Sequence, residues 1–337
     1  MRLITYAYEE RMEIGALLSG DTGLVRLQAA YVEQHGMSSP HLVTMLSFLA
    51  GNTVAHEVAL SAMEYGMKNS GPDLVLDLST VKILAPVPTP ESIREFMNFE
   101  QHVINATRKY GMKPWRAKLD LWIETTFGRQ RTLAYTSNQP WYERPVYYKG
   151  NRFSVVGNDA DIVIPSYTKV FDYELEFGIY LCKRGRDIDV ETARSYIGGY
   201  TIFNDFSARD IQGREMGGRL GPAKGKDFDT GNCMGPVLVT PDEIPDPYAL
   251  SMRARINGEE VSLGNSKDMY FTFEEVLAYV SKSETLYPGE FFGSGTCSGR
   301  QGMGCGLEHG RFLKAGDVIE LEVEHIGILR NKIVAGV

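Results

Sequence analysis

The chain has 337 residues, which is enough for one large domain and a smaller one. Its hydrophobic fraction of 43% and charged fraction of 23% are typical of a globular protein in water. The formal net charge of -8 argues against nucleic acid or an anionic membrane as the main partner.

The first residues contain no apolar core of signal-peptide length, and no apolar run approaches the length of a membrane-spanning helix. The chain has four cysteines, and none forms a C-x-x-C pair that would indicate a disulfide framework or a zinc cage: Cys182, Cys233, Cys297 and Cys305. We therefore expect a cytoplasmic protein of a size typical of enzymes, with reduced cysteines, that does not enter a membrane.

The N-terminal part of the sequence predicts a hairpin, two helices and a strand. A Gly-Asp-Thr-Gly turn at 20–23 separates two apolar strands at 14–18 and 24–27. Helical stretches follow at 42–49 and 54–65, and a strand from 81 runs into a connector with proline at every second position up to 90. We place a domain boundary there, between an N-terminal α+β domain (1–85) and a catalytic domain (86–337).

Residues 90–111 predict one helix, with Thr89 as its N-cap, Pro90 at its first position and Gly111 at its end. In such a helix Glu95 and His102 lie two turns apart on nearly the same face, about 10 Å apart along the axis, where both can line one cleft. The alternative interpretation of His102 is a half-buried helix histidine bonded to a neighbour.

The remaining sequence is rich in strands. Residues 113–144 show weak periodicity and predict a long surface excursion. From Pro145 onward, short strands alternate with Gly, Pro, Asn and Asp, with helices near 190–196 and 273–281. The strict alternation of apolar and polar residues in 316–324 predicts a strand with one solvent-exposed face. The glycine-rich 302–306 and 223–227 fit neither a dinucleotide loop nor a P-loop.

Three carboxylates are spaced so that they can share one hard metal ion. Glu174 and Glu176 are two residues apart in an apolar strand, so both side chains point to the same face. Asp205 follows one strand and one helix later. Since burying unpaired carboxylates is costly, this arrangement favours a bound cation.

The motifs resemble, in their order, those of the fumarylacetoacetate hydrolase family. They extend from about Leu84 to the C-terminus and comprise Phe99-Glu100-Gln101-His102, Asp172-Tyr173-Glu174-Leu175-Glu176, Asn204 to Gln212, Gly225 to Thr230 and Gly295 to Gly299. The resemblance implies an α+β, strand-rich fold, a mixed β-sandwich roll of the fumarylacetoacetase C-terminal type with a smaller N-terminal α+β domain. It also implies a homodimer.

By the same resemblance, Glu174, Glu176 and Asp205 hold Mg²⁺ or Ca²⁺, with Mn²⁺ as a third candidate. A fourth acidic ligand is expected seven positions before His102, where fumarylacetoacetases have aspartate and this chain has Glu95. The longer side chain can ligate directly, swing away or bind through water. An all-oxygen site suits these metals and disfavours zinc or copper.

The resemblance also assigns the catalytic roles. His102 is expected to activate a water and Glu308 to orient it, because a carboxylate fixes the tautomer of a neutral imidazole. The expected oxyanion-stabilising residues are Lys226, Arg209 and Gln212, and the expected substrate contacts are Tyr148 and Thr296. Taken singly, Arg209 can simply pair with Asp210 or Asp205, and Lys226 can be a surface lysine in a glycine-rich loop.

Two departures change the expected substrate. Fumarylacetoacetases have tyrosines where this chain has Met97 and Met216, which indicates a less polar acyl pocket. The leading hypothesis is metal-dependent hydrolysis of a C–C bond in a 2,4-diketo acid, as in an acylpyruvase. Alternatives are an oxaloacetate decarboxylase or tautomerase, an isomerase of a related 2-oxo acid, and a non-catalytic carboxylate binder.

Overall fold

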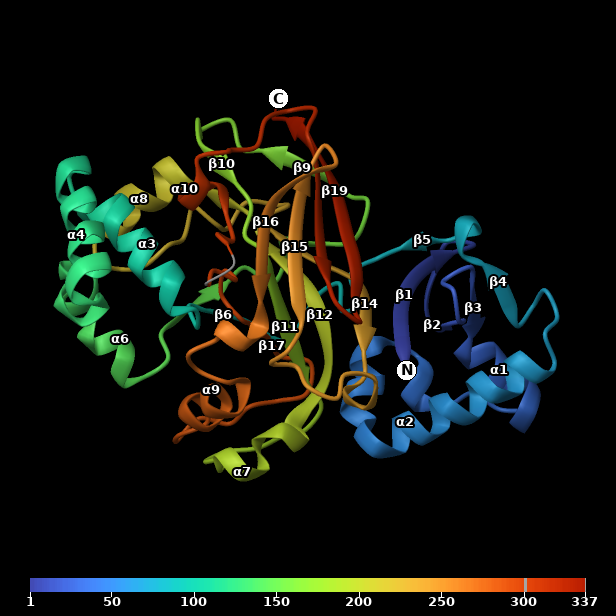
Figure 1. The fold of residues 1–337 in the computed structure, drawn as a ribbon. Helices are drawn as coiled ribbons and strands as arrows, with labels where there is room; N and C mark the ends of the chain where they lie inside the picture. Colours follow the sequence, from blue (N-terminus) through green and yellow to red (C-terminus); the bar gives the residue numbers. More distant parts are fainter. Residues whose placement is uncertain (300–301, 337) are drawn as a thin grey trace.

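The computed structural model describes residues 1–299 and 302–336, and its fold is the expected strand-rich α+β type (Figure 1). The largest sheet has twelve strands and runs β4-β3-β2-β1-β14-β12-β11-β17-β6-β7, with β5 beside β1 and β8 beside β14. Its strands are β1 (Arg2–Tyr8), β2 (Arg11–Leu17), β3 (Gly23–Arg26), β4 (Val75–Asp77), β5 (Lys82–Ile83), β6 (Ile93–Phe96), β7 (Tyr147–Gly150), β8 (Val155–Val156), β11 (Glu176–Leu181), β12 (Ile197–Asp205), β14 (Asn232–Val239) and β17 (Phe291–Gly293).

A second sheet packs on the first through contacts of β18 and β19 with β12 and β14. It is ordered β16-β15-β18-β19-β9, with strands β9 (Asp161–Ile164), β15 (Ser251–Ile256), β16 (Glu259–Asn265), β18 (Val318–Val323) and β19 (Gly327–Ala335). The short strands β10 (Phe171–Asp172) and β13 (Ser207–Ala208) form a third, two-stranded sheet. Side chains of both large sheets share one buried apolar core, which includes Phe177, Ile202 and Leu321.

Two groups of helices lie on opposite sides of the molecule, and α7 and α9 lie together apart from both groups. Figure 1 shows α1 and α2 beside β1 to β4 on one side, and α3, α4, α8 and α10 grouped on the other. The helices are α1 (Leu27–His35), α2 (Met45–Lys68), α3 (Glu100–Gly111), α4 (Pro114–Phe127), α5 (Leu133–Thr136), α6 (Gln139–Glu143), α7 (Val190–Ala193), α8 (Arg209–Gly217), α9 (Phe273–Val280) and α10 (Gly306–His309). The 3₁₀ helices are η1 (Pro40–Leu42), η2 (Leu78–Thr80), η3 (Arg129–Arg131), η4 (Arg194–Tyr196), η5 (Pro241–Glu243) and η6 (Ser266–Asp268).

The N-terminal predictions are largely confirmed. The hairpin is β2 paired with β3, with Leu17 opposite Leu24. The two expected helices form one helix, α2, which bends at Asn52, where φ is 47°. The sequence analysis missed α1. Strand β1 pairs with β14, so the N-terminal part continues the same sheet as the rest of the chain.

The helix predicted for 90–111 is wrong in its first half. Residues 93–96 form strand β6, which pairs with β17 on one side and β7 on the other. All four residues are buried, and helix α3 begins only at Glu100. The proline and glutamate that favour a helix start are overridden by pairing with a strand nearly 200 residues later, which local sequence cannot reveal. Glu95 and His102 therefore belong to different elements.

The segment 113–144 is helical, which its weak periodicity did not predict. Its first helix, α4, is tied to α3 by an ion pair of Arg108 Nε with Asp120 Oδ2 at 2.9 Å. The carboxylate of Asp120 also accepts from the backbone of Leu133 at 2.6 Å, which connects α4 to α5. The segment lies at the surface as expected, since Trp115 and Trp122 in α4 are more than half exposed.

Predictions for the C-terminal half agree with the structure. Helices α7 and α9 lie where helices were expected, and β18 alternates between buried and half-buried residues. The four cysteines are free and buried. Among the helices of the described residues, none has both the length and the apolar character required to cross a membrane.

Candidate active site

Four buried carboxyl groups converge at the end of the large sheet near α3 and α8. Glu95 comes from β6, Glu176 from the start of β11 and Asp205 from the end of β12, while Glu174 precedes β11 in an isolated bridge with Cys305. Each of these residues is at most 5% exposed. One oxygen from each of Glu174, Glu176 and Asp205 lies within 4.8 Å of the other two.

Main-chain geometry makes room for Glu95 and Glu176. Gly293 is the β17 residue opposite Glu95, and a Cβ at Gly293 would lie 1.6 Å from Glu95 Oε2. The carboxyl group of Glu95 can therefore occupy this position because residue 293 has no side chain. The backbone nitrogen of Gly295 donates to Glu95 Oε1 at 2.9 Å and to Glu176 Oε2 at 3.1 Å, which holds the two carboxyl groups side by side.

Two buried cations neutralise part of this charge. The Lys226 Nζ atom lies 2.7 Å from Glu174 Oε2 and 2.6 Å from Asp205 Oδ2. Arg209 lies 2.8 Å from Glu174 Oε1 through one nitrogen and 2.7 Å from Asp172 Oδ2 through Nε. Lys226 is 2% exposed, so its interpretation as a surface lysine is wrong, and Arg209 pairs with neither Asp205 nor Asp210.

The carboxyl groups consequently differ in acidity. Burial opposes ionisation of Glu174, but Arg209 and Lys226 outweigh it and hold the pKa of Glu174 well below its usual range. Burial, reinforced by the charges of neighbouring carboxylates, raises the pKa of Glu95 and Glu176 well above the usual value. Burial also raises the pKa of Asp205 to about 6, against the opposing charge of Lys226. Arg209 and Lys226 therefore do not suffice to keep all four carboxyl groups ionised, and a further bound cation would favour their ionised forms.

The residues fit a divalent cation bound by oxygen. Glu95 Oε2 and Asp205 Oδ1 are buried and accept no hydrogen bond from any described residue. Ligand distances of about 2.0–2.6 Å place opposite oxygens of one Mg²⁺, Mn²⁺ or Ca²⁺ ion about 4–5 Å apart, which agrees with the spacing of the cluster. The donor set contains neither nitrogen nor sulfur, which disfavours zinc and copper.

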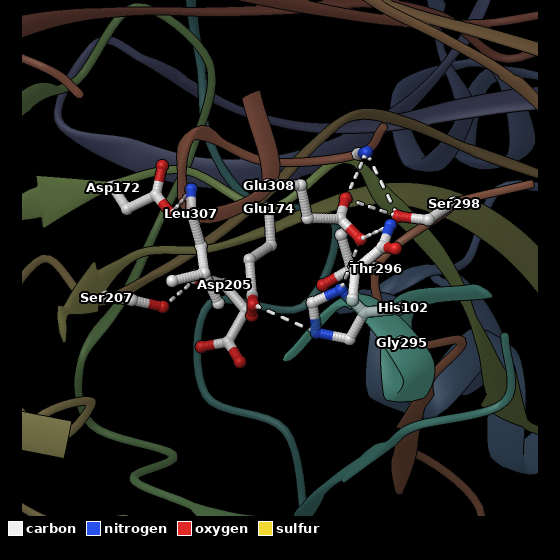
Figure 2. A network of polar contacts seen from close by, with 12 residues as sticks. His102, Asp172, Glu174, Asp205, Ser207, Gly295, Thr296, Ser298, Leu307 and Glu308 are labelled. Atoms are coloured by element: carbon white, nitrogen blue, oxygen red, sulfur yellow. Dashed lines mark hydrogen bonds and ion pairs between the residues drawn. The ribbon is translucent and has the colours of Figure 1, made fainter. Parts of the chain in front are cut away.

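A histidine–glutamate pair lies beside the cluster. His102 on α3 faces Glu308 on α10 with its Nδ1 at 3.3 Å from Glu308 Oε1, and its Nε2 lies 4.0 Å from Glu174 Oε1 (Figure 2). His102 is 5% exposed. Because Nδ1 is beside a carboxylate acceptor, the neutral ring donates its proton there and leaves Nε2 as a base directed toward the cluster.

Glu308 is held as a carboxylate. It accepts from Asn105 Nδ2 at 2.9 Å, from Ser298 Oγ at 2.6 Å and from the backbone nitrogen of Gly304 at 2.7 Å. Burial opposes ionisation of Glu308, but the hydrogen bonds of His102, Ser298 and Asn105 outweigh it and lower its pKa. Sequence reasoning missed Asn105 and Ser298, because neither belongs to a spacing that indicates contact with Glu308.

Sequence reasoning also missed Asp172, which anchors the first residues of α10. Its carboxylate accepts from the backbone nitrogens of Gly306 and Leu307, both at 2.8 Å, in addition to Arg209. Figure 2 shows Asp172 beside Leu307. Asp172 therefore ties the Glu308 helix to the strand that precedes Glu174. A signal was present, since Asp172 lies two residues before Glu174 in the same alternating stretch.

The remaining predicted residues lie in the same region. Tyr148 donates its hydroxyl to Asp205 Oδ2 at 2.6 Å, and Thr296 Oγ1 lies 3.5 Å from Glu176 Oε1. Gln212 accepts from Arg209 at 3.0 Å. His309 ends α10, and its Nε2 lies 2.8 Å from the hydroxyl oxygen of Tyr173, within hydrogen-bond distance.

A cavity of about 510 Å³ opens onto this cluster. Every residue predicted for the site lines it except Glu308, which lies behind His102: Glu95, His102, Tyr148, Glu174, Glu176, Asp205, Arg209, Gln212, Lys226 and Thr296. The structure thus brings together residues from six separate stretches of the chain. A small-molecule substrate that reaches the carboxylates would contact His102 and Lys226 from the same cavity.

Comparison with known proteins gives a family and a range of reactions. The family model described as the C-terminal part of fumarylacetoacetate (FAA) hydrolase matches residues 93–334. A human protein named oxaloacetate tautomerase FAHD2A, mitochondrial, is 36% identical over 58% of this chain and 61% of its own length. A Xenopus laevis protein named oxaloacetate tautomerase fahd2, mitochondrial, is 32% identical over 86% of this chain and 78% of its own length.

The fold also matches solved structures over the whole chain. Maleylpyruvate hydrolase from Sphingobium sp. SYK-6, solved with manganese(II) and pyruvate, superposes with a TM-score of 0.69 and 18% identity, covering 100% of both chains. At this identity the match concerns the fold alone. The alignment with the human relative spans less than two thirds of that protein, so its activity is not transferred with the similarity.

Proposed function

The chain belongs to the fumarylacetoacetate hydrolase family, and on that premise we propose that it is a metal-dependent hydrolase of a 2,4-diketo acid such as an acylpyruvate. The observation that carries this proposal is the His102–Glu308 pair, with its imidazole Nε2 4.0 Å from a carboxylate of the acidic cluster. A base held in this tautomer is what activation of a hydrolytic water requires.

Glu95, Glu174, Glu176 and Asp205 would hold the cation, Mg²⁺, Mn²⁺ or Ca²⁺. When bound, it would act as a Lewis acid toward the 2-oxo acid group of the substrate. Glu174 remains ionised at neutral pH because Arg209 and Lys226 lower its pKa. It would therefore be the ligand that needs no deprotonation.

His102 would take a proton from water through Nε2 as the water oxygen adds to the acyl carbonyl of the substrate. Collapse of the tetrahedral adduct breaks the bond between the acyl carbon and C3 and gives a carboxylic acid and the pyruvate enolate. The imidazolium then returns the proton to C3, and Glu308 stabilises its positive charge meanwhile. The sum is one water consumed, one carboxylic acid formed and one pyruvate formed.

Lys226 would act by charge rather than as a base. Burial disfavours its ammonium form, but the charges of Asp205 and Glu174 outweigh it and raise the pKa of Lys226. It therefore remains protonated, and together with Arg209 it would stabilise negative charge that develops on substrate oxygens. The side-chain amide nitrogen of Gln212 would donate to the same region, since its oxygen is taken by Arg209.

A second candidate is tautomerisation of oxaloacetate, which the names of the curated relatives favour. The same Nε2 of His102 would take a proton from C3 of the keto form, and the imidazolium would return a proton to the 2-oxo oxygen, directly or through water, which gives the enol with no C–C bond broken. A homodimeric state, implied by the family resemblance, is part of both proposals.

Proton NMR of reaction products distinguishes the candidates. Protein with and without added Mg²⁺ is incubated with acetylpyruvate, a longer acylpyruvate and oxaloacetate, and His102→Asn is the matched inactive control. Metal-dependent release of pyruvate and a free carboxylic acid supports the hydrolase. Exchange of the C3 protons of oxaloacetate without cleavage of any acylpyruvate refutes it in favour of the tautomerase, and full turnover by His102→Asn refutes both roles of the base.

A further inference from the structure

The cavity changes in character with distance from the carboxylate cluster. Helix α3 presents His102, Ala106 and Tyr110 to it, and these residues are four apart and so share one helix face. At 1.5 Å per residue, Ala106 and Tyr110 lie about 6 and 12 Å beyond His102 along the helix axis. The imidazole of His102 thus stands at the start of this face, and a small apolar residue and an aromatic ring follow it.

Helix α8 repeats the pattern. Arg209 and Gln212, in its first turn, are bonded to each other beside Glu174, and Met216 follows one turn later on the cavity side. Beyond the helix, Leu220 also lines the cavity and is 96% exposed. Covering this leucine with the apolar surface of a ligand would lower the free energy of the complex, because apolar surface is removed from water.

The far parts of the two helices approach each other. A Cβ at Gly213 would lie 3.4 Å from the ring of Tyr110, so the α3 tyrosine packs over the backbone of α8. Met97, which follows β6, lines the same cavity together with Pro222. The distal wall is therefore composed of methionine, leucine, proline and aromatic surface.

No described cation lining the cavity is available to a second, distal carboxylate inside it. Arg209 and Lys226 are both bonded to carboxylates of the cluster. Lys149 also lines the cavity, but it is exposed, and ion pairs at exposed lysines contribute little because water and salt screen them. A charged acyl terminus would face apolar side chains there and would gain no buried cationic partner.

We propose that the site takes 2-oxo acids whose distal group is uncharged and apolar, so that the substrate class is an aliphatic or aryl acylpyruvate rather than a dicarboxylate. This inference rests on the proposed binding of a 2-oxo acid at the cluster. Met97, Met216 and Leu220 are the specificity-determining residues. Each methylene that the distal wall covers strengthens binding about fourfold, which is the transfer free energy of one buried CH₂ expressed as a ratio.

The test measures binding, so that it does not depend on turnover. Isothermal titration of the Mg²⁺-loaded protein compares pyruvate, 2-oxooctanoate and 2-oxosuberate, the last two differing only in a terminal methyl or carboxylate. We expect 2-oxooctanoate to bind at least tenfold more tightly than either of the others. Met216→Arg should weaken 2-oxooctanoate and strengthen 2-oxosuberate. Met67→Arg, on α2, adds the same charge at another exposed methionine and should change neither affinity.

Each result of these titrations either supports or contradicts the proposed preference for an apolar distal group. Binding of 2-oxosuberate equal to or tighter than that of 2-oxooctanoate overturns the proposal, as does equal binding of 2-oxooctanoate and pyruvate. An unchanged preference in Met216→Arg removes Met216 from the specificity determinants. If 2-oxooctanoate is preferred but no acylpyruvate is cleaved, the apolar cavity stands and the hydrolase assignment fails, so the two failures are distinguishable.

Discussion

Replacement of Glu308 by glutamine should leave the imidazole of His102 in place and prevent it from acting as a base. Both carboxylate oxygens accept from two donors: Oε1 from His102 and Asn105, and Oε2 from Ser298 and the backbone of Gly304. A glutamine must turn its NH₂ group toward one of these pairs. The N–H of Gly304 cannot rotate away, whereas the imidazole can change tautomer and the amide of Asn105 can flip.

The variant Glu308→Gln should therefore direct its NH₂ group toward His102 and place the imidazole proton on Nε2, where the base is needed. Loss of a general base costs about 10²–10⁴ in kcat, which corresponds to about 3–5 kcal/mol at 1.36 kcal/mol per tenfold change. The assay is kcat for pyruvate release from an acylpyruvate, with Mg²⁺ affinity measured in parallel by calorimetry. The affinity should change little, since Glu308 is not in the carboxylate cluster.

Two variants sharpen this measurement. Ser298→Ala removes one of the four donors and leaves the carboxylate, so kcat should fall by less than about tenfold, the scale of one hydrogen bond. Glu308→Asp keeps the charge and should recover part of the activity. If Glu308→Gln is folded, binds Mg²⁺ and retains kcat within about threefold of the parent, the role of the pair in proton transfer is refuted.

Three further predictions follow from the charge pattern. Glu174→Gln should weaken Mg²⁺ binding at least tenfold in calorimetric titration while the circular dichroism spectrum is unchanged; an unaltered affinity would remove Glu174 from the ligand set. Asp172→Asn should lower the free energy of urea unfolding by about 3 kcal/mol or more, because it weakens a buried ion pair with Arg209, and a loss below 1 kcal/mol would contradict this. Glu13 accepts from Arg26 at 2.7 Å, and although burial opposes its ionisation, this bond lowers its pKa in the folded state. Its contribution is therefore present above the ordinary carboxyl pKa of about 4.3 and is lost as pH falls through the lower folded value. Glu13→Gln should cost about 1–3 kcal/mol at pH 7, and the difference should shrink in unfolding curves recorded below pH 4; a difference independent of pH would exclude this origin.

Local sequence predicted the elements whose signals are local. The Gly20–Gly23 turn and the alternation in β18 each depend on a few adjacent residues, and both predictions agree with the structure. Strand β6 was mistaken for a helix because its identity depends on pairing with β17, about 200 residues later. The helices of 113–144 were missed because ion pairs such as Arg108–Asp120, rather than an apolar stripe, tie them to α3.

The residues of the candidate site likewise divide into those that local sequence predicts and those that it does not. Glu174 and Glu176 follow from a spacing of two in an extended stretch, and their convergence with Asp205 is present in the structure. By contrast, the support of Glu308 by Asn105 joins residues 203 apart, and no pattern within either segment indicates it. The fit of Glu95 depends on the missing side chain of Gly293, which is visible only when the two strands are side by side.

The pairing of β1 with β14 has a consequence for how the protein can be divided. Leu3 and Arg2 of β1 lie opposite Leu238 and Val239 of β14. A shortened protein that begins at residue 86 would leave part of the outer side of β14 without its β1 partner. An open strand of this kind, carrying apolar residues, is a template for pairing with other chains. The first eighty-five residues thus cover part of a strand edge that would otherwise be open to pairing with other chains.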